Sequence, residues 1–380
     1  MKEFYGNFKL GILGGGQLGR MLIQSAIDYN IDVNILDPAP QAPCANIATK
    51  FTCGSLTDFE TVYNFGKECD LVTIEIENVN TEALKKLVSE GVTVFPQPEI
   101  IELIQDKVAQ KNFYKENGIP TSPYHVVKNR EEVMEHADFL PFVNKLAKEG
   151  YDGRGVKVIK SPEDISQGFN AYGLVEKYID FDTEISVIVA RNEKGETASF
   201  PTVEMSFHPT ANMVEFLFSP AVISPDIENE AKKIAEKVIE KLNMVGLLAV
   251  EMFVTKNGEV VVNEIAPRPH NSGHQTIEAN LTSQYEQHLR AILNMPLGKT
   301  DIIFPSAMVN LLGEDGFSGE VYCEGMEEFL AIEGVHLHLY GKKETKPFRK
   351  MGHVTIVDSD PESLRIKARK VKDTLKIKTK

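Results

Sequence analysis

One stretch of the chain, residues 248–274, constrains the fold more than any other. Two runs of strand-forming residues lie on either side of Asn257-Gly258. Asn-Gly is the dipeptide most typical of a two-residue β-hairpin turn, because both turn residues need positive φ. Counting back from that turn pairs Glu251 with Glu264. The sequence therefore predicts a hairpin that carries two carboxylates directly opposite each other.

Such a pair of carboxylates needs a compensating charge. Cβ atoms of opposed hairpin residues lie about 4.5–5.5 Å apart, and two carboxylates at that distance repel by roughly 3 kcal/mol at an effective dielectric near 20. Two solvated glutamates are the simpler alternative, but Met252 and Phe253 between the pair favour a buried hairpin. Mg²⁺ is usually held by one or two carboxylates together with substrate phosphates. We therefore predict that Glu251 and Glu264 bind a divalent cation.

A glycine-rich segment near the start of the chain, GGGQLGR at residues 14–20, follows a predicted strand at 10–13. A helical pattern comes next, and then a second strand at 33–36 that ends at Asp37. Strand, G-x-G-x-x-G, helix, strand and acid together match the dinucleotide fingerprint, which taken alone indicates an NAD-dependent oxidoreductase. The glycines themselves require only a phosphate at a helix N-terminus, so a phosphorylated metabolite is an equal alternative.

Strands and helices alternate up to about residue 95, which predicts a doubly wound parallel sheet and the α/β class. The strand at 71–74 ends at Glu75. Ligands of open α/β sheets bind at the carboxyl ends of the strands, so Glu75 is a candidate ligand, with a solvated acid as the alternative.

A second glycine-rich segment, EGYDGRG at residues 149–155, lies between predicted strands at 142–145 and 156–159. This arrangement predicts a hairpin lid that closes over a polyphosphate. The alternative is a flexible surface turn. Tyr151, Asp152 and Arg154 favour the lid, because a simple turn does not need these side chains.

Composition excludes some classes of function. The net charge is −14 over 380 residues, which disfavours a nucleic-acid partner. The four cysteines form no C-x-x-C pair and no apolar run reaches the length of a membrane span, so we expect no membrane partner and a cytoplasmic protein. A cationic loop at 340–350 predicts a phosphate clamp from Lys342 and Arg349, with improved solubility as the alternative.

These motifs occur in a recognisable order. The segments GYDGRG (150–155) and NEIAPRPHNSGH (263–274), together with GGGQLGR (14–20), are long and specific. Over nearly the whole chain the sequence resembles the ATP-grasp superfamily, and within it the N5-carboxyaminoimidazole ribonucleotide synthetases of purine biosynthesis. The resemblance implies an N-terminal doubly wound parallel-sheet domain (1–100), a central α+β ATP-grasp domain (101–298) and a small C-terminal β-rich domain (299–380). It also implies a homodimer.

The ligands implied by the resemblance are ATP, Mg²⁺, bicarbonate and 5-aminoimidazole ribonucleotide. The residues that would bind ATP are Lys107, Lys145, Gly150, Tyr151, Asp152, Gly153, Arg154, Gly155, Val156, Glu176, Lys177, Tyr178, Ile179, Glu184, His208, Asn263 and Glu264. The metal ligands would be Glu251 and Glu264. The residues around bicarbonate and the reacting amine would be Tyr151, Asp152, Arg154, Arg268 and His270. The ribonucleotide would be held by Gln17, Glu75, Lys342 and Arg349.

The expected reaction is the phosphorylation of bicarbonate by ATP, followed by capture of the carboxyl group by the substrate's exocyclic amine. Carboxyphosphate is the intermediate, and Asp152 or His270 would accept the amine proton. Three alternatives remain at this point. They are a formate-dependent phosphoribosylglycinamide transformylase or another ATP-grasp ligase, an NAD-dependent oxidoreductase, and a nucleotide-sensing module without catalysis.

Overall fold

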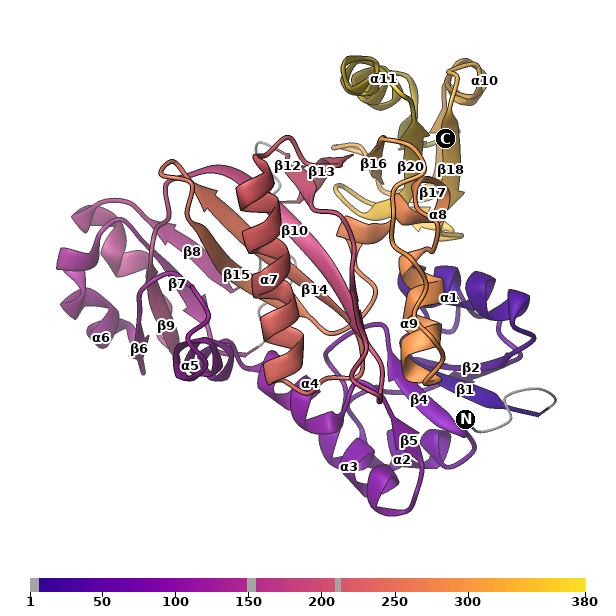
Figure 1. The fold of residues 1–380 in the computed structure, drawn as a ribbon, viewed down its shortest axis with the longest axis horizontal. Helices are drawn as coiled ribbons and strands as arrows, with labels where there is room; N and C mark the ends of the chain where they lie inside the picture. The colour runs from indigo at the N-terminus through magenta and orange to yellow at the C-terminus, as the bar shows by residue number, and fades with distance from the viewer. Residues whose placement is uncertain (1–6, 149–154, 209–212) are drawn as a thin grey trace.

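The computed structural model describes residues 7–148, 155–208 and 213–380. Figure 1 shows a central sheet under the long helix α7 (Pro225–Lys241), with a small sheet at one end and the N-terminal parallel sheet at the other. The predictions for Gly150, Tyr151, Asp152, Gly153 and Arg154 concern residues outside the described ranges.

The N-terminal part is the expected doubly wound parallel sheet. Its strand order is β3-β2-β1-β4-β5, and every pairing is parallel. One face packs on helices α2 and α3, and the other face packs on α1. The elements are β1 Lys9–Leu13, α1 Gln17–Asp28, β2 Asp32–Asp37, β3 Lys50–Cys53, α2 Phe59–Gly66, β4 Leu71–Ile74, α3 Thr81–Ser89, β5 Thr93–Val94 and α4 Pro98–Gln105.

A helix from much later in the chain completes the α1 face of this sheet. Tyr285, Leu289 and Ile292 of α9 (Gln284–Ile292) share one hydrophobic cluster with Leu10 and Ile12 of β1. Figure 1 shows α9 beside α1. The N-terminal sheet is therefore packed directly against the central part of the chain, which holds the carboxyl ends of its strands beside the later site residues.

The small sheet is antiparallel and has the strand order β6-β9-β7-β8. The chain enters it through α5, whose N-cap Asp106 accepts hydrogen bonds from the backbone of Val108 and Ala109. The elements are α5 Lys107–Glu116, β6 Tyr124–Val127, α6 Arg130–Glu135, η1 Ala137–Phe139, β7 Phe142–Leu146, β8 Val156–Ile159, η2 Pro162–Gln167 and β9 Gly173–Lys177.

The central sheet is antiparallel throughout and continues into the C-terminal part of the chain. Its order is β15-β14-β10-β12-β13-β16-β20-β18, with β11 paired to β10. The apolar stripe of α7 packs on one face of this sheet. The side chains at that interface form the largest hydrophobic cluster of the described residues. The elements are β10 Phe181–Arg191, β11 Thr197–Ser199, β12 Val203–Phe207, β13 Val214–Ser219, β14 Gly246–Thr255, β15 Val260–Ala266, β16 Ser306–Leu312, β18 Val335–Leu339 and β20 Lys350–Val357.

The C-terminal part is rich in short strands, as the sequence predicts. A three-stranded sheet, β19-β17-β21, lies next to the end of the central sheet, and α11 packs on β16 and β20. The remaining elements are η3 Asn271–Gly273, α8 Thr276–Ala279, β17 Gly319–Glu324, α10 Met326–Leu330, β19 Glu344–Thr345, α11 Pro361–Thr374 and β21 Lys376–Thr379. Within the described ranges, no helix combines the length and the apolar character needed to cross a membrane.

Candidate active site

The β14–β15 hairpin has a longer turn than the sequence indicates. Thr255 and Glu259 close it, because the Thr255 N–H donates to the Glu259 carbonyl. The turn is therefore formed by the three residues 256–258, and Gly258 adopts the positive φ of 81° that such a loop needs. The predicted two-residue turn is wrong, and by itself this change would move every later pair by one residue.

A β-bulge in β15 restores the predicted pairing of the two carboxylates. Met252 pairs with Val262, but Glu251 pairs with Glu264, so Asn263 is the additional residue. A bulge leaves one residue unpaired and redirects its side chain. The opposition of Glu251 and Glu264 is therefore confirmed, and the bulge also places the Asn263 amide beside them.

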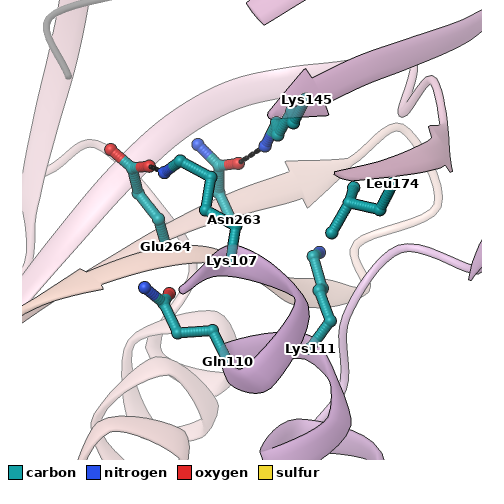
Figure 2. Close-up of a pocket in the computed structure, with 7 residues that line it drawn as sticks. All are labelled: Lys107, Gln110, Lys111, Lys145, Leu174, Asn263 and Glu264. Carbon is teal, nitrogen blue, oxygen red and sulfur yellow. Dashed lines mark hydrogen bonds and ion pairs between the residues drawn. The ribbon is translucent and has the colours of Figure 1, made fainter. Parts of the chain in front are cut away.

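Two lysines reach this pair from different elements (Figure 2). Lys107, the first residue of α5, donates through Nζ to Glu264 Oε2 at 2.7 Å. Lys145 on β7 donates through Nζ to Asn263 Oδ1 at 3.1 Å. Both lysines line a small cavity together with Gln110, Lys111, Leu174, Asn263 and Glu264. The structure thus places Lys107 and Lys145, both predicted to bind ATP, against the hairpin.

The carboxylates of this site are unequally compensated. The Lys107 ammonium group lowers the pKa of Glu264 to about 2. Burial and the neighbouring Glu264 raise the pKa of Glu251 to about 8. Burial and the charges of Glu251 and Glu264 raise the pKa of Glu184, on β10, to about 9. The site therefore holds more carboxylate groups than nearby ammonium groups can keep ionised.

This donor set fits the predicted magnesium ion. Within the parts of the chain that the structure describes, no group of three or more His, Cys, Asp and Glu side chains could hold a metal. The paired carboxylates of Glu251 and Glu264 match the one or two protein ligands that Mg²⁺ commonly takes alongside water and phosphate oxygens. A cation there would offset the repulsion that raises the pKa of Glu251.

His270 lies against the same pair of carboxylates. Its Nε2 is 3.5 Å from Glu251 Oε1, and its Nδ1 is 2.9 Å from Ser272 Oγ. Burial lowers the pKa of His270 to about 3, with further contributions from Arg268 and Lys350. The imidazole is therefore neutral near pH 7. Its Nδ1 accepts from the Ser272 N–H at 3.3 Å, which leaves the ring proton on Nε2, on the side of Glu251.

The backbone of His270 is fixed by a residue that the sequence did not indicate. Gln284, the first residue of α9, is fully buried. Its Oε1 accepts from the His270 N–H at 2.8 Å, and its Nε2 donates to the His270 carbonyl at 2.8 Å. Both amide atoms of one side chain thus determine where the imidazole stands. No local pattern marks this glutamine, because its partner is in another segment.

Arg268 connects the hairpin to the N-terminal sheet. Its Nε lies 2.8 Å from Glu77 Oε1, just beyond the end of β4. The carboxyl edge of the parallel sheet and the end of the hairpin therefore meet here.

The glycine loop is filled by carboxylates of the protein itself. The N–H groups of Gly16 and Gly19 donate to the two oxygens of Glu75, and the N–H of Gly15 donates to Asp37 Oδ2 at 2.7 Å. A Cβ on Gly16 would lie 2.5 Å from Glu75 Oε1, which explains that glycine. In this structure the loop is not an open cradle for a phosphate, and the dinucleotide interpretation loses its physical basis.

Two predicted ribonucleotide ligands meet next to this loop. Lys342 Nζ donates to Gln17 Oε1 at 3.0 Å and to the Lys350 carbonyl at 2.6 Å. Arg349, the neighbour of Lys350, donates through Nη1 to the Glu344 carbonyl at 2.7 Å. Lys350 is not among the residues that the sequence indicated for the site. Its charge acts to lower the pKa of Glu251 and of His270. Cations from the C-terminal loop therefore extend from the glycine loop towards the hairpin.

His208 is placed beside the C-terminal loop rather than among the lysines of Figure 2. Its Nε2 is 4.0 Å from Glu215 Oε1, and its ring meets the ring of Phe348 edge-on at 5.6 Å. Gly155 and Val156 are described, and Val156 pairs with Lys145 at the start of β8. Their predicted roles towards ATP remain predictions.

The segment predicted to bind adenine leaves the small sheet at its end. Glu176 and Lys177 are the last residues of β9, and Tyr178 and Ile179 follow it. The N–H groups of Lys177 and Tyr178 donate to the carbonyls of Pro123 and Pro141, which fixes the path of this segment. The Glu176 side chain is almost completely buried.

Family models match three consecutive parts of the chain. A ribonucleotide synthetase preATP-grasp domain matches residues 8–105, an ATP-grasp domain matches 112–285, and a phosphoribosylaminoimidazole carboxylase C-terminal domain matches 306–367. Together with the observed fold, these matches confirm the expected ATP-grasp architecture.

Whole-chain comparisons agree with the family models. The chain is 38% identical to the N5-carboxyaminoimidazole ribonucleotide synthase of Bacillus subtilis over 92% of this chain and 91% of that protein. The N5-carboxyaminoimidazole ribonucleotide synthetase structure from Thermotoga maritima matches with a TM-score of 0.91 and 44% identity, over 98% of this chain and all of that one. An Aspergillus clavatus synthase in complex with ADP and 5-aminoimidazole ribonucleotide matches with a TM-score of 0.88 and 34% identity, over 97% and 98% of the two chains.

Proposed function

Because the chain belongs to the N5-carboxyaminoimidazole ribonucleotide synthase family, we propose that the residues gathered around the hairpin carry out its reaction. The protein is an ATP-dependent ligase that carboxylates 5-aminoimidazole ribonucleotide in purine biosynthesis. Our proposal concerns which side chains bind each substrate and which of them act in the chemical steps.

The observation that carries the proposal is that Lys107 and Lys145 contact Glu264 and Asn263 of the hairpin. Glu264 is paired across the hairpin with Glu251. Lys107 and Lys145 bind the ATP phosphates, and the segment 176–179 together with Glu184 and His208 binds the nucleoside. Glu251 and Glu264 hold Mg²⁺, which when bound supplies charge stabilisation to the transferred phosphoryl group. Gly155, Val156 and the neighbouring residues 150–154 cover the phosphates.

In the first step a bicarbonate oxygen attacks the γ-phosphorus of ATP, the bond to ADP breaks, and carboxyphosphate forms. Both reactants are anions, so fixed cations must offset their repulsion before the bond can form. Lys145 and Lys107 act on the phosphate, and Arg268 acts on bicarbonate from the side of the N-terminal sheet. Tyr151, Asp152 and Arg154 complete the binding of this small anion. Carboxyphosphate reacts with water, so closure of the site protects it.

In the second step the exocyclic amine of the ribonucleotide attacks the carboxyl carbon and phosphate leaves. The amine nitrogen must then lose a proton. His270 lies beside the hairpin carboxylates, with Nε2 3.5 Å from Glu251 Oε1, and it and Asp152 are the two groups that could accept this proton. Gln17, Glu75, Lys342 and Arg349 hold the ribonucleotide, with the two cations on its phosphate.

Two further properties complete the proposal. The family resemblance supports a homodimer, and sedimentation of the purified protein at several concentrations tests it. The four cysteines are free thiols in the structure, which supports a reducing, cytoplasmic location.

An oxygen-labelling experiment tests the reaction. Bicarbonate labelled with heavy oxygen should deliver one labelled atom to the phosphate that is formed, because the attacking oxygen stays on phosphorus. The run must be short compared with oxygen exchange between bicarbonate and water. Phosphate release should need both bicarbonate and the ribonucleotide for sustained turnover, and formate should not replace bicarbonate. Unlabelled phosphate would refute the carboxyphosphate step.

A further inference from the structure

A buried cluster of charges lies behind the lysines of the hairpin site, and no role follows for it from the reaction. Its centre is the carboxylate of Glu176, which forms ion pairs with Lys145 on one oxygen and with Lys111 on the other, the latter at 2.5 Å. Lys111 and Glu176 are each 3% exposed. One carboxylate is thus shared by two ammonium groups away from water.

Lys111 is held firmly by further oxygens. Its Nζ donates to Thr121 Oγ1 at 2.6 Å and to Ser122 Oγ at 3.1 Å. Thr121 Oγ1 in turn donates to the Val262 carbonyl at 2.8 Å, directly before the bulge residue Asn263. The ammonium group of Lys111 is therefore satisfied by the protein and is tied to the strand that carries the hairpin site.

Lys107, Lys111 and Lys145 differ in what they contact. Lys107 and Lys111 lie one turn apart on α5, but Lys107 points to Glu264 and Lys111 to Glu176. Lys145 forms an ion pair with Glu176 and also donates a hydrogen bond to Asn263 of the hairpin. Burial by itself would raise the pKa of Glu176, but the charges of Lys145 and Lys111 outweigh it and keep this carboxyl group ionised.

An ionised carboxylate next to Lys145 competes with any phosphate that Lys145 is to bind. A single buried carboxylate with one ammonium partner forms a tight pair, since water does not screen the attraction. With two ammonium partners the same negative charge is already balanced by Lys111. The second cation, Lys145, then carries a net positive charge that is available to another anion.

We propose that Lys111 is a positioning residue that neutralises Glu176 and thereby keeps the Lys145 ammonium group available to the ATP phosphates. Lys111 does this without touching the nucleotide. The inference rests on the proposed contact between Lys145 and ATP, and it adds to that contact a reason for a third buried lysine in the cluster.

The test compares the Michaelis constants for ATP and for the ribonucleotide in five variants. In Lys111→Met, Glu176 keeps Lys145 as its only cation, so the KM for ATP should rise by roughly tenfold, with the KM for the ribonucleotide within twofold. In the double variant Lys111→Met with Glu176→Gln, the competing charge is gone, and the KM for ATP should fall by at least threefold relative to Lys111→Met. Glu176→Gln alone gives the reference for the double variant.

Lys115→Met is the matched control, because Lys115 is exposed on the same helix, and it should leave both constants unchanged. All variants are assayed below their melting temperatures, which are measured separately. A lowered melting temperature for Lys111→Met with an unchanged KM for ATP would overturn the proposal in favour of a structural role. Failure of the double variant to recover would overturn it in favour of direct contact between Lys111 and the nucleotide.

Lys145→Met separates this inference from the proposed function. If Lys145→Met leaves the KM for ATP unchanged, the proposed role of Lys145 is wrong, and the role of Lys111 falls with it. If Lys145→Met raises the KM for ATP strongly and Lys111→Met does not, only the role of Lys111 is wrong.

Discussion

The molecule has two regions that the sequence marks for anion binding, and they differ in how their donors are satisfied. At the hairpin, the donors are the ammonium groups of Lys107 and Lys145, paired with Glu264 and Glu176. In the glycine loop, the donors are backbone amides, and they are bound to the carboxylate of Glu75 and to Asp37. Both regions have internal anions, but the donors are side-chain ammonium groups in the first region and backbone amides in the second.

The difference matters because an ammonium group can turn to a new partner, whereas a backbone amide cannot. Amides of a glycine loop are fixed in direction, so an internal carboxylate that fits them closes the loop as a binding site. Glu75 is partly buried, and both of its carboxylate oxygens accept from loop amides, so it is not a loose occupant. We infer that the ammonium groups of the hairpin region bind the ATP phosphates directly and that the amides of the glycine loop mainly fix Glu75.

The sharpest test of the hairpin region is Glu264→Gln, for which we expect the largest effect. The change keeps the volume and removes the charge that pairs with Lys107 and opposes Glu251. Turnover should fall by about a thousandfold or more, or about 4 kcal/mol in transition-state stabilisation. Glu259→Gln, at the exposed turn of the same hairpin, is the control. Full activity of Glu264→Gln at ordinary Mg²⁺ concentration would remove the metal role.

The next test concerns the phosphate of the ribonucleotide. Because the glycine amides are filled, this phosphate must be held by side chains, and Arg349→Ala should raise the KM for the ribonucleotide by roughly 30-fold, or about 2 kcal/mol. The KM for ATP should change by less than twofold. Lys346→Ala, an exposed cation of the same loop, is the control. Equal increases in the KM values for the ribonucleotide and for ATP would indicate that Arg349 contacts the nucleotide or has a structural role instead.

Glu75→Gln tests the glycine loop itself. Glutamine has one amide oxygen and one NH₂ group, so one of the N–H groups of Gly16 and Gly19 would lose its acceptor. An unsatisfied buried donor costs about 1–3 kcal/mol, and thermal unfolding should show a loss of this size. Glu82→Gln, on the exposed side of α3, should show none. An unchanged melting temperature for Glu75→Gln would mean that the loop does not depend on its carboxylate.

The two regions were not equally predictable from the sequence. The Asn257-Gly258 signal gave the hairpin and the pairing of Glu251 with Glu264, although the longer turn and the bulge at Asn263 each moved the register by one residue and cancelled. A bulge is set by partners across the sheet and leaves no local pattern. The fold class followed from the periodicity of strands and helices, which is a local property, and the structure confirms it.

What the sequence could not give are contacts between residues far apart in the chain. The filling of the glycine loop joins Gly16 to Glu75 across 59 positions, and the ion pair between Lys111 and Glu176 spans an even longer segment. Gln284 is another case, since its amide fixes His270 from the start of a different helix. Such pairs depend on how the sheets are placed relative to one another.

The smallest expected effect is on thermal stability, and it separates the two regions through Mg²⁺ and pH. The pKa of Glu251 is about 8 in the folded protein and near 4.5 when exposed. Between these values the folded state holds more protons, so stability without metal should fall as pH rises from 5 to 8.

Mg²⁺ binds the ionised carboxylates and should therefore raise the melting temperature more at pH 8 than at pH 5, by roughly 3 °C or more. In Glu251→Gln the metal effect should be largely lost and the fall should become smaller, with the remainder due to Glu184, whose pKa burial also raises. Glu75→Gln should keep the metal effect, because its carboxylate is bound by amides. Equal Mg²⁺ effects at the two pH values in the unaltered protein would contradict metal binding at the hairpin and remove the distinction between the two regions.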